Sequence, residues 1–180
     1  MYAKKYIISG LIIVLLLVSS TIFSSCGGNY MSLKDISPKF YELIESGNLN
    51  YVTLNIYYKD FWVLTRMPVT LERLIGGWYD YKVTVFGEQL KEHLDLLNRL
   101  SNTVLIPVRN PSFVNARLYY VFEHEKYGEI LSFLTFSGNN TIFINGHEVE
   151  HNGIFYEVAI PFLPDDAIER IEERVSRLRR

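Results

Sequence analysis

The segment His147-Glu148-Val149-Glu150-His151 matches the H-E-x-x-H pattern of zinc peptidases. In that pattern a helix brings two histidines to one zinc ion and the glutamate activates a water molecule. Asn-Gly pairs stand on both sides of the segment, at 145–146 and 152–153, and Asn-Gly is typical of turns that join strands. In a strand the two histidines would lie about 13 Å apart, too far to share one ion. We therefore interpret 147–151 as a strand.

The rest of the sequence holds no stronger catalytic pattern. It contains no G-x-S-x-G, no S-x-x-K and no glycine-rich phosphate loop after a strand. Asp165 and Asp166 are adjacent at the start of an expected helix, where carboxylates cap the helix. We expect a protein that is not an enzyme and needs no cofactor, and the zinc-dependent hydrolase built on His147, Glu148 and His151 remains an alternative.

The only cysteine of the 180 residues, Cys26, follows a distinctive N-terminal segment. Lys4 and Lys5 precede the apolar run of residues 6–23, and two serines stand directly before the cysteine. This arrangement resembles the signal peptides of small bacterial lipoproteins. The resemblance implies cleavage after residue 25 and lipidation of Cys26, which would anchor the protein in a membrane of the cell envelope, outside the cytoplasm.

An uncleaved membrane span is the alternative for this segment, because residues 6–23 approach the ~20 apolar residues that cross a bilayer. Either way the remaining residues leave the cytoplasm. After removal of residues 1–25, 16 basic and 20 acidic side chains remain. This acidic balance shows no footprint for nucleic acid, and it leaves the contact with the membrane to the lipid anchor.

Hydrophobic periodicity indicates the elements of the remaining chain. Helices are expected over residues 40–46, 71–75, 88–101 and 164–180, the third being a long amphipathic helix. Strands are expected over 51–58, 61–66, 78–86, 103–108, 114–124 and 129–136. The first two would form a hairpin. Residues 141–144, 147–151 and 154–160 would form a C-terminal three-stranded meander, because Asn-Gly pairs separate them.

These elements predict an α+β fold. We expect a mostly antiparallel sheet with a C-terminal β-meander, packed by the 88–101 helix and closed by a C-terminal helix. The expected organisation is a signal peptide at 1–25, the lipidated cysteine and a tether at 26–36, and a single α+β domain at 37–180.

Neighbouring aromatic pairs in the strands suggest a binding surface, since successive strand residues point to opposite faces. The outer face of the sheet is expected to carry Tyr57, Trp78, Asp80, Lys82, Arg117 and Tyr119. Tyrosine and tryptophan offer a large contact area with a polar tip, so this face could bind a partner or a sugar. The alternative is that these aromatic residues pair across strands and only stabilise the sheet.

Three functions follow from these observations. The first is a lipid-anchored cell-envelope protein that acts as a binding or structural module for a protein or peptide partner, with Tyr57, Trp78, Arg117 and Tyr119 as partner-binding residues. The second is the zinc hydrolase, with His147 and His151 as metal ligands. The third is an inhibitor or immunity-type lipoprotein.

Overall fold

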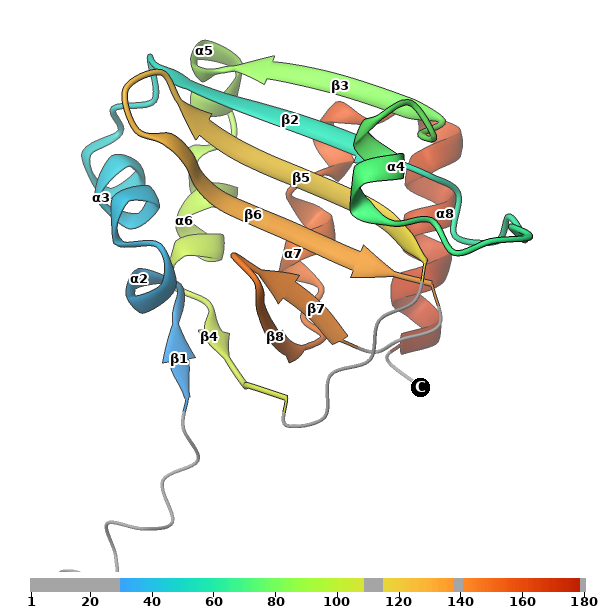
Figure 1. The fold of residues 1–180 in the computed structure, drawn as a ribbon. Helices are drawn as coiled ribbons and strands as arrows, with labels where there is room; N and C mark the ends of the chain where they lie inside the picture. The colour runs from blue at the N-terminus through green and yellow to red at the C-terminus, as the bar shows by residue number, and fades with distance from the viewer. Residues whose placement is uncertain (1–29, 109–114, 138–140, 179–180) are drawn as a thin grey trace, which may run out of the picture. The chain divides into compact units, whose positions relative to one another are not determined.

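The computed structural model describes residues 30–108, 115–137 and 141–178. Cys26 and the segment before it lie outside the described residues. Met31–Arg180 is one compact unit, built on an antiparallel sheet of six strands in the order β3-β2-β5-β6-β7-β8 (Figure 1). The predicted α+β class is confirmed, with a mostly antiparallel sheet and a C-terminal helix.

The strands alternate between a core side and an outer side. Their bounds are β2 Val52–Tyr58, β3 Tyr81–Phe86, β5 Ala116–His124, β6 Gly128–Phe136, β7 Thr141–Ile144 and β8 His147–Glu150. In β2 every second residue, from Val52 to Tyr58, is buried, as the sequence pattern predicts. β7 and β8 meet at Asn145 and Gly146, which both have positive φ, the conformation that an Asn-Gly turn requires.

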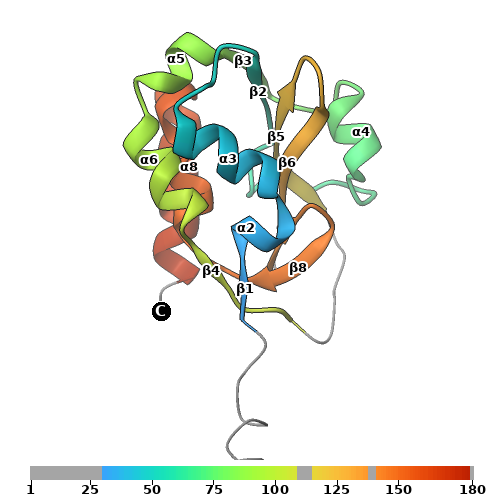
Figure 2. The same ribbon diagram turned by 90° about the vertical axis from the view of Figure 1, so that its left-hand side faces the viewer.

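Helices cover the core side of the sheet. They are α3 Pro38–Ser46, α5 Gly87–Lys91, α6 Leu94–Ser101, α7 Ile154–Glu157 and α8 Asp165–Leu178. Figure 2 shows α3, α5, α6 and α8 on one side of the sheet and α4 on the other. The main hydrophobic core lies under the first group and contains Phe40, Leu97, Phe133 and Ile171.

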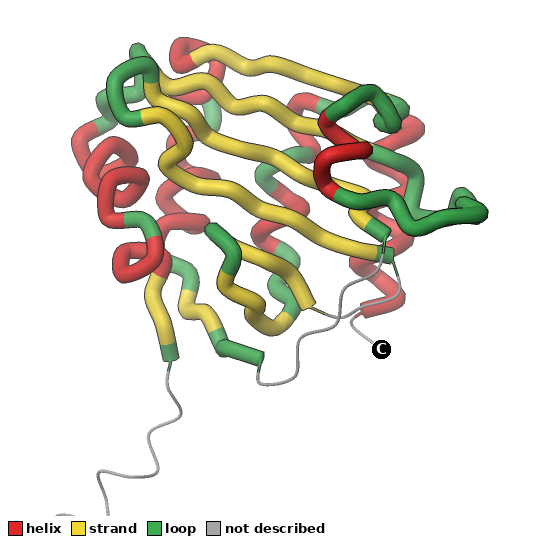
Figure 3. The backbone as a smooth tube through the Cα atoms, in the orientation of Figure 1, coloured by secondary structure: helices red, strands yellow, loops and turns green. Residues whose placement is uncertain are grey.

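The outer side of the sheet has much less cover. Of the helices that the structure describes, only α4 Leu71–Ile75 lies over it, beside the long irregular segment between β2 and α4 (Figure 3). Under α4 is a second, smaller cluster of buried residues, made of Val69, Leu74, Ala116, Phe136 and Phe143. This sparse cover leaves much of the outer face open.

The prediction of one long helix at 88–101 is wrong in detail, because the chain forms two short helices, α5 and α6, over this region. His93 leaves helical geometry, with φ −114° and ψ 25°, and its ring packs edge-on against Phe162 at 5.0 Å. Gly87 starts α5 against the main chain of Leu49, where a Cβ atom would lie 1.8 Å from the Leu49 carbonyl oxygen. Two tertiary contacts therefore fix where each helix lies.

The predictions of two strands are also wrong. Residues 61–66 form turns and loop, so β2 pairs with β3 and not with this segment. Residues 154–157 form the helix α7, because most of the run is buried and an apolar run without alternation suits a buried helix as well as a strand. The C-terminal meander exists, but it consists of β5, β6, β7 and β8.

The compact unit begins before residue 37, within the segment expected as a tether. β1 Met31–Ser32 pairs with β4 Val104–Leu105 as a separate two-stranded sheet. α2 Leu33–Ile36 follows, capped by Ser32 and Asp35, and Leu33 is fully buried. Four residues, 27–30, therefore separate Cys26 from β1 in the sequence.

Candidate partner-binding site

The segment between β2 and β3 exposes an unusual group of apolar side chains. Val63, Leu64, Met67 and Trp78 line one open pocket of about 440 Å³, and we call these four residues the apolar tip. Leu64 is 99 % exposed, and the other three are also exposed. Because exposing large apolar groups together is unfavourable in water, such a group is a candidate contact surface.

Hydrogen bonds hold the tip in place, although it contains no regular structure. The Asp60 N–H donates to the Asp80 carboxylate at 2.8 Å, and the Trp62 N–H donates to the Asp60 carboxylate at 2.8 Å. The Asn115 side chain accepts from the Val69 N–H at 2.9 Å. These bonds fix both ends of the segment, so the exposed side chains are presented on an ordered loop.

Arg73 secures the Trp78 side of the tip. Its guanidinium carbon lies 3.8 Å from the centre of the Trp78 ring, a cation–π contact. Arg73 comes from α4 and Trp78 from the residues after it, so the helix and the tryptophan are locked together. One face of the Trp78 ring is thereby covered, while the residue remains 47 % exposed.

Arg117 lies beneath the tip and not on the outer face where the sequence placed it. It is only 2 % exposed, because β5 changes register against β6 between Ala116 and Leu118. One guanidinium nitrogen, Nη2, donates to the Val63 carbonyl at 2.8 Å, while Nε and Nη1 have no hydrogen-bond partner among the described residues. Burial lowers the pKa of Arg117, and the carboxylates of Asp60 and Asp80 oppose that shift. Arg117 therefore supports the tip from inside.

Tyr57 and Tyr119 do lie together on the outer side of the sheet. They are direct partners in the β2–β5 register, with ring centres 6.1 Å apart, and Tyr79 packs edge-on against Tyr57 at 5.8 Å. Both are half-buried and pack against the cluster under α4. Burial raises the pKa of Tyr119 to about 12, with help from the carboxylates of Glu129 and Glu123. These two tyrosines mainly support α4.

The H-E-x-x-H segment forms a strand, as the sequence indicated. Residues 147–150 are β8, with Val149 in the core and Glu148 on the opposite side, where it accepts a hydrogen bond from Thr141 at 2.5 Å. The His151 ring packs against Tyr156 at 5.2 Å. Among the residues that the structure describes, no three His, Cys, Asp or Glu side chains are grouped as ligands for one metal ion.

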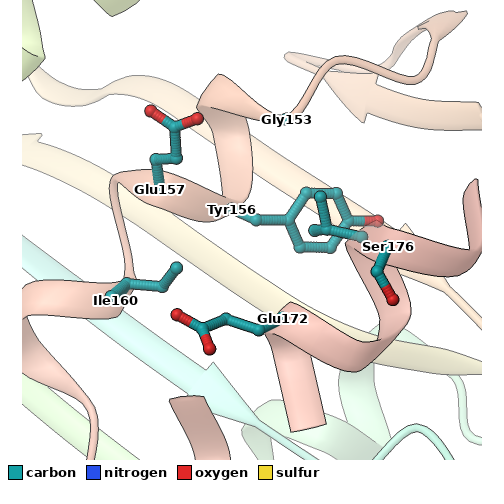
Figure 4. Close-up of a pocket in the computed structure, with 7 residues that line it drawn as sticks. Gly153, Tyr156, Glu157, Ile160, Glu172 and Ser176 are labelled. Carbon is teal, nitrogen blue, oxygen red and sulfur yellow. The ribbon is translucent and has the colours of Figure 1, made fainter. Parts of the chain in front are cut away.

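A second pocket, of about 230 Å³, lies between α7 and α8 and is lined by Tyr156, Glu157, Glu172 and Ser176, among others (Figure 4). The two carboxylates point in different directions in Figure 4, and Glu157 pairs with Arg99 at 2.8 Å. The Ser176 hydroxyl donates to the carbonyl of Glu173 in its own helix. Glu157 and Ser176 thus have partners within the fold, and the residues of this pocket do not include a nucleophile hydrogen-bonded to a base.

Charge around the apolar tip differs from the rest of the molecule. Residues 59–82 hold four basic and three acidic side chains, whereas the other residues from Cys26 onward hold 12 and 17. Lys59 pairs with Asp80 at 2.5 Å, but Arg66, which lines the pocket, is exposed and makes no ion pair with any described residue. The tip therefore combines apolar surface with a positive charge.

No protein-family model, curated protein sequence or solved structure matches the chain. Across the three described stretches of the chain, no helix has the length and apolar character needed to cross a bilayer.

Sequence reasoning found Trp78 but missed the other three residues of the tip. Residues 61–64 are four consecutive apolar residues, and such a run predicts a strand because β-forming residues dominate it. The neighbouring Lys59-Asp60 pair was the available signal of a loop, since the Asp60 side chain accepts a hydrogen bond from the backbone N–H of Trp62.

Proposed function

We propose that this protein is a lipid-anchored module of the cell envelope that binds a protein or peptide partner through its apolar tip. The observation that carries the proposal is the exposure of Val63, Leu64, Met67 and Trp78 around one pocket on an ordered loop. A binding role without chemistry of its own fits the pockets described above, in which no nucleophile and base converge. Cys26 remains the proposed anchor, from the resemblance of its surroundings to lipoprotein signal peptides.

The position of the tip favours a protein partner over the bilayer. The chain enters the domain at β1, at the lower left of Figure 1, whereas the loop that carries the tip projects on the right. Cys26 stands five residues before Met31, and five extended residues span at most about 18 Å. An anchor this close to β1 would hold β1 near the membrane, whereas the tip lies on a different side of the domain from β1.

The proposed anchor is tested by the intact mass and membrane partition of the protein beside a Cys26→Ser variant. We expect the wild type to gain the mass of a diacylglycerol and to lose residues 1–25, while the variant stays uncleaved. If both forms keep residues 1–25 and have the same mass apart from the substitution, the anchor is a membrane span and not a lipid.

The proposed binding surface is tested by affinity purification from detergent-solubilised cell envelopes of the native host. We compare the wild type with the double variant Leu64→Ser/Met67→Ser and with Tyr51→Ser, a matched control that removes an exposed aromatic residue, 59 % exposed, elsewhere on the surface. We expect one defined partner with the wild type and with the control, and none with the double variant. Equal recovery with all three proteins would contradict binding through the tip.

A further inference from the structure

The two edges of the six-stranded sheet are not equivalent. At the β8 edge, Val108 N–H donates to the Glu148 carbonyl at 3.1 Å and Glu150 N–H donates to the Ile106 carbonyl at 2.8 Å. Residues 106–108 therefore cover that edge. At the other edge, β3 pairs only with β2 in the described structure. An uncovered edge strand presents free N–H and C=O groups to any strand that can pair with them.

The hydrogen bonds of β2 show which groups of β3 are free. The Tyr51 carbonyl accepts from Glu125 and the Lys59 N–H donates to Arg117, so the odd-numbered residues of β2 turn their main chain toward β5. Directly opposite residues of an antiparallel pair alternate between bonded and non-bonded pairs, so the even-numbered residues turn theirs toward β3. In the β2–β3 register, Leu54 lies opposite Val85 and Ile56 opposite Val83.

It follows that the odd-numbered residues of β3 bond to β2, and that Lys82, Thr84 and Phe86 turn their main-chain groups to the open edge. The Phe86 N–H supports this assignment, because it donates to the Gln89 side chain at 3.1 Å and not to a strand. Lys82 and Thr84 are exposed, and their four main-chain groups remain available for a new strand.

We propose that a second copy of this chain occupies the edge, so that β3 pairs antiparallel with β3 of the second copy and the two Val83 residues face each other across a twofold axis. In this register Lys82 exchanges both main-chain hydrogen bonds with Thr84 of the second copy, and Thr84 does the same with Lys82. The half-buried side chains of Tyr81 and Val83, which face the core side, are then covered by the added strand.

The side chains of β3 favour this register over the two neighbouring registers, which are centred on Lys82 and on Thr84. Pairing Lys82 with Lys82 of the second copy would place two ammonium groups side by side, which is destabilising. Pairing Thr84 with Thr84 would set Lys82 opposite Phe86, whose N–H already bonds to Gln89. The register centred on Val83 avoids both conflicts.

The same geometry limits the assembly to two chains. The pairing is isologous, because the same edge is used by both copies, and an isologous contact closes on itself. The β8 edge offers no second site, since residues 106–108 occupy it at Val149. We therefore expect a dimer and no further growth into fibres.

The experiment compares Thr84→Pro with Thr84→Ala in the full chain, purified in detergent, by sedimentation equilibrium over a wide range of protein concentration. Both variants lose the hydrogen bond from the Thr84 hydroxyl to Asn55 at 2.8 Å, but only proline loses the outward N–H. Proline is tolerated on an edge strand where the N–H faces solvent, so circular dichroism should show both variants folded. We expect a dimer for the wild type and for Thr84→Ala, and a dissociation constant roughly 10- to 100-fold weaker for Thr84→Pro.

A wild type that stays monomeric at every concentration, or a Thr84→Pro dimer as stable as that of Thr84→Ala, would overturn the proposal. If the proline variant does not fold, amide hydrogen exchange of the wild type tests whether the β3 edges pair. The amides of Lys82 and Thr84 should become protected as the concentration rises, and an unchanged rate of exchange would overturn the proposal by itself.

Discussion

The two faces of the sheet differ in how they are covered. On the core face, helices from both ends of the chain bury a large cluster that includes stacked rings such as Phe133 on Tyr120 at 4.7 Å. On the outer face α4, alone among the described helices, lies over a cluster of five buried residues, and the loop beside it exposes the apolar tip. The comparison indicates that the core face provides most of the stability, while the outer side carries the surface proposed here for binding.

The largest expected effect compares one phenylalanine from each face. Phe133 is 1 % exposed and stacks on Phe155 at 5.5 Å, whereas Phe136 is 7 % exposed and belongs to the small cluster. We expect Phe133→Ala to lower the free energy of unfolding by about 3–5 kcal/mol, and Phe136→Ala by less. Urea unfolding measures both. A greater loss for Phe136→Ala would mean that α4 and its cluster contribute more to stability than the core face does.

The next effect is a loss of stability at alkaline pH. Burial raises the pKa values of Tyr58, Tyr119, Tyr120 and Tyr156 above the usual 10.0, and that of Tyr119 to about 12. Since unfolded tyrosines release their protons first, the contribution of these tyrosines to stability is constant below about pH 10 and falls as the pH rises toward 12. Tyr119→Phe should reduce this fall by roughly 1–2 kcal/mol, which urea unfolding at a series of pH values measures. An identical fall in the variant would show that Tyr119 ionises as readily in the folded protein as in the unfolded chain.

Replacing Arg117 should change the free energy of unfolding by less than the burial of this residue suggests. Two of its nitrogens have no hydrogen-bond partner among the described residues, so its desolvation is only partly offset. We expect Arg117→Met to change the free energy of unfolding by no more than about 1 kcal/mol, because methionine fills the space without a charge. The Val63 carbonyl loses its donor, so trypsin should cleave faster after Arg66. A decrease of several kcal/mol in the free energy of unfolding would instead show that the carboxylates of Asp60 and Asp80 depend on the Arg117 guanidinium for their stabilisation.

The smallest expected effect on stability is at the tip itself. Leu64 is 99 % exposed, so Leu64→Ser should leave the free energy of unfolding within about 0.5 kcal/mol of the wild type. Thermal unfolding monitored by circular dichroism measures the difference. A clear loss of stability would indicate that Leu64 packs within the protein and is not presented to a partner.

Local patterns in the sequence predicted the elements whose periodicity is strong. The alternation in β2 and the Asn-Gly turn before β8 are both present, since side-chain direction and turn conformation depend on adjacent residues. The C-terminal helix α8 follows its apolar stripe and its acidic first turn. These features needed no information from distant parts of the chain.

The errors share a different cause, which is contact between distant residues. The position of Arg117 depends on the register shift between β5 and β6, and the loop at 61–66 depends on bonds from Asp60 to Asp80 and from Arg117 to Val63. The break between α5 and α6 follows from the packing of His93 on Phe162. No local pattern contains these contacts, so the apolar tip became visible only in the folded chain.

The central claim is that the apolar tip is the surface that binds a partner, and photo-crosslinking in intact cells of the native host tests it most directly. A photoreactive amino acid replaces Leu64 in one strain and Tyr51 in another, both positions being highly exposed. The account predicts a discrete protein adduct from position 64, lost when Met67→Ser and Trp78→Ala are added, and no such adduct from position 51. The same adducts from both positions, or adducts with lipid alone from position 64, would contradict it.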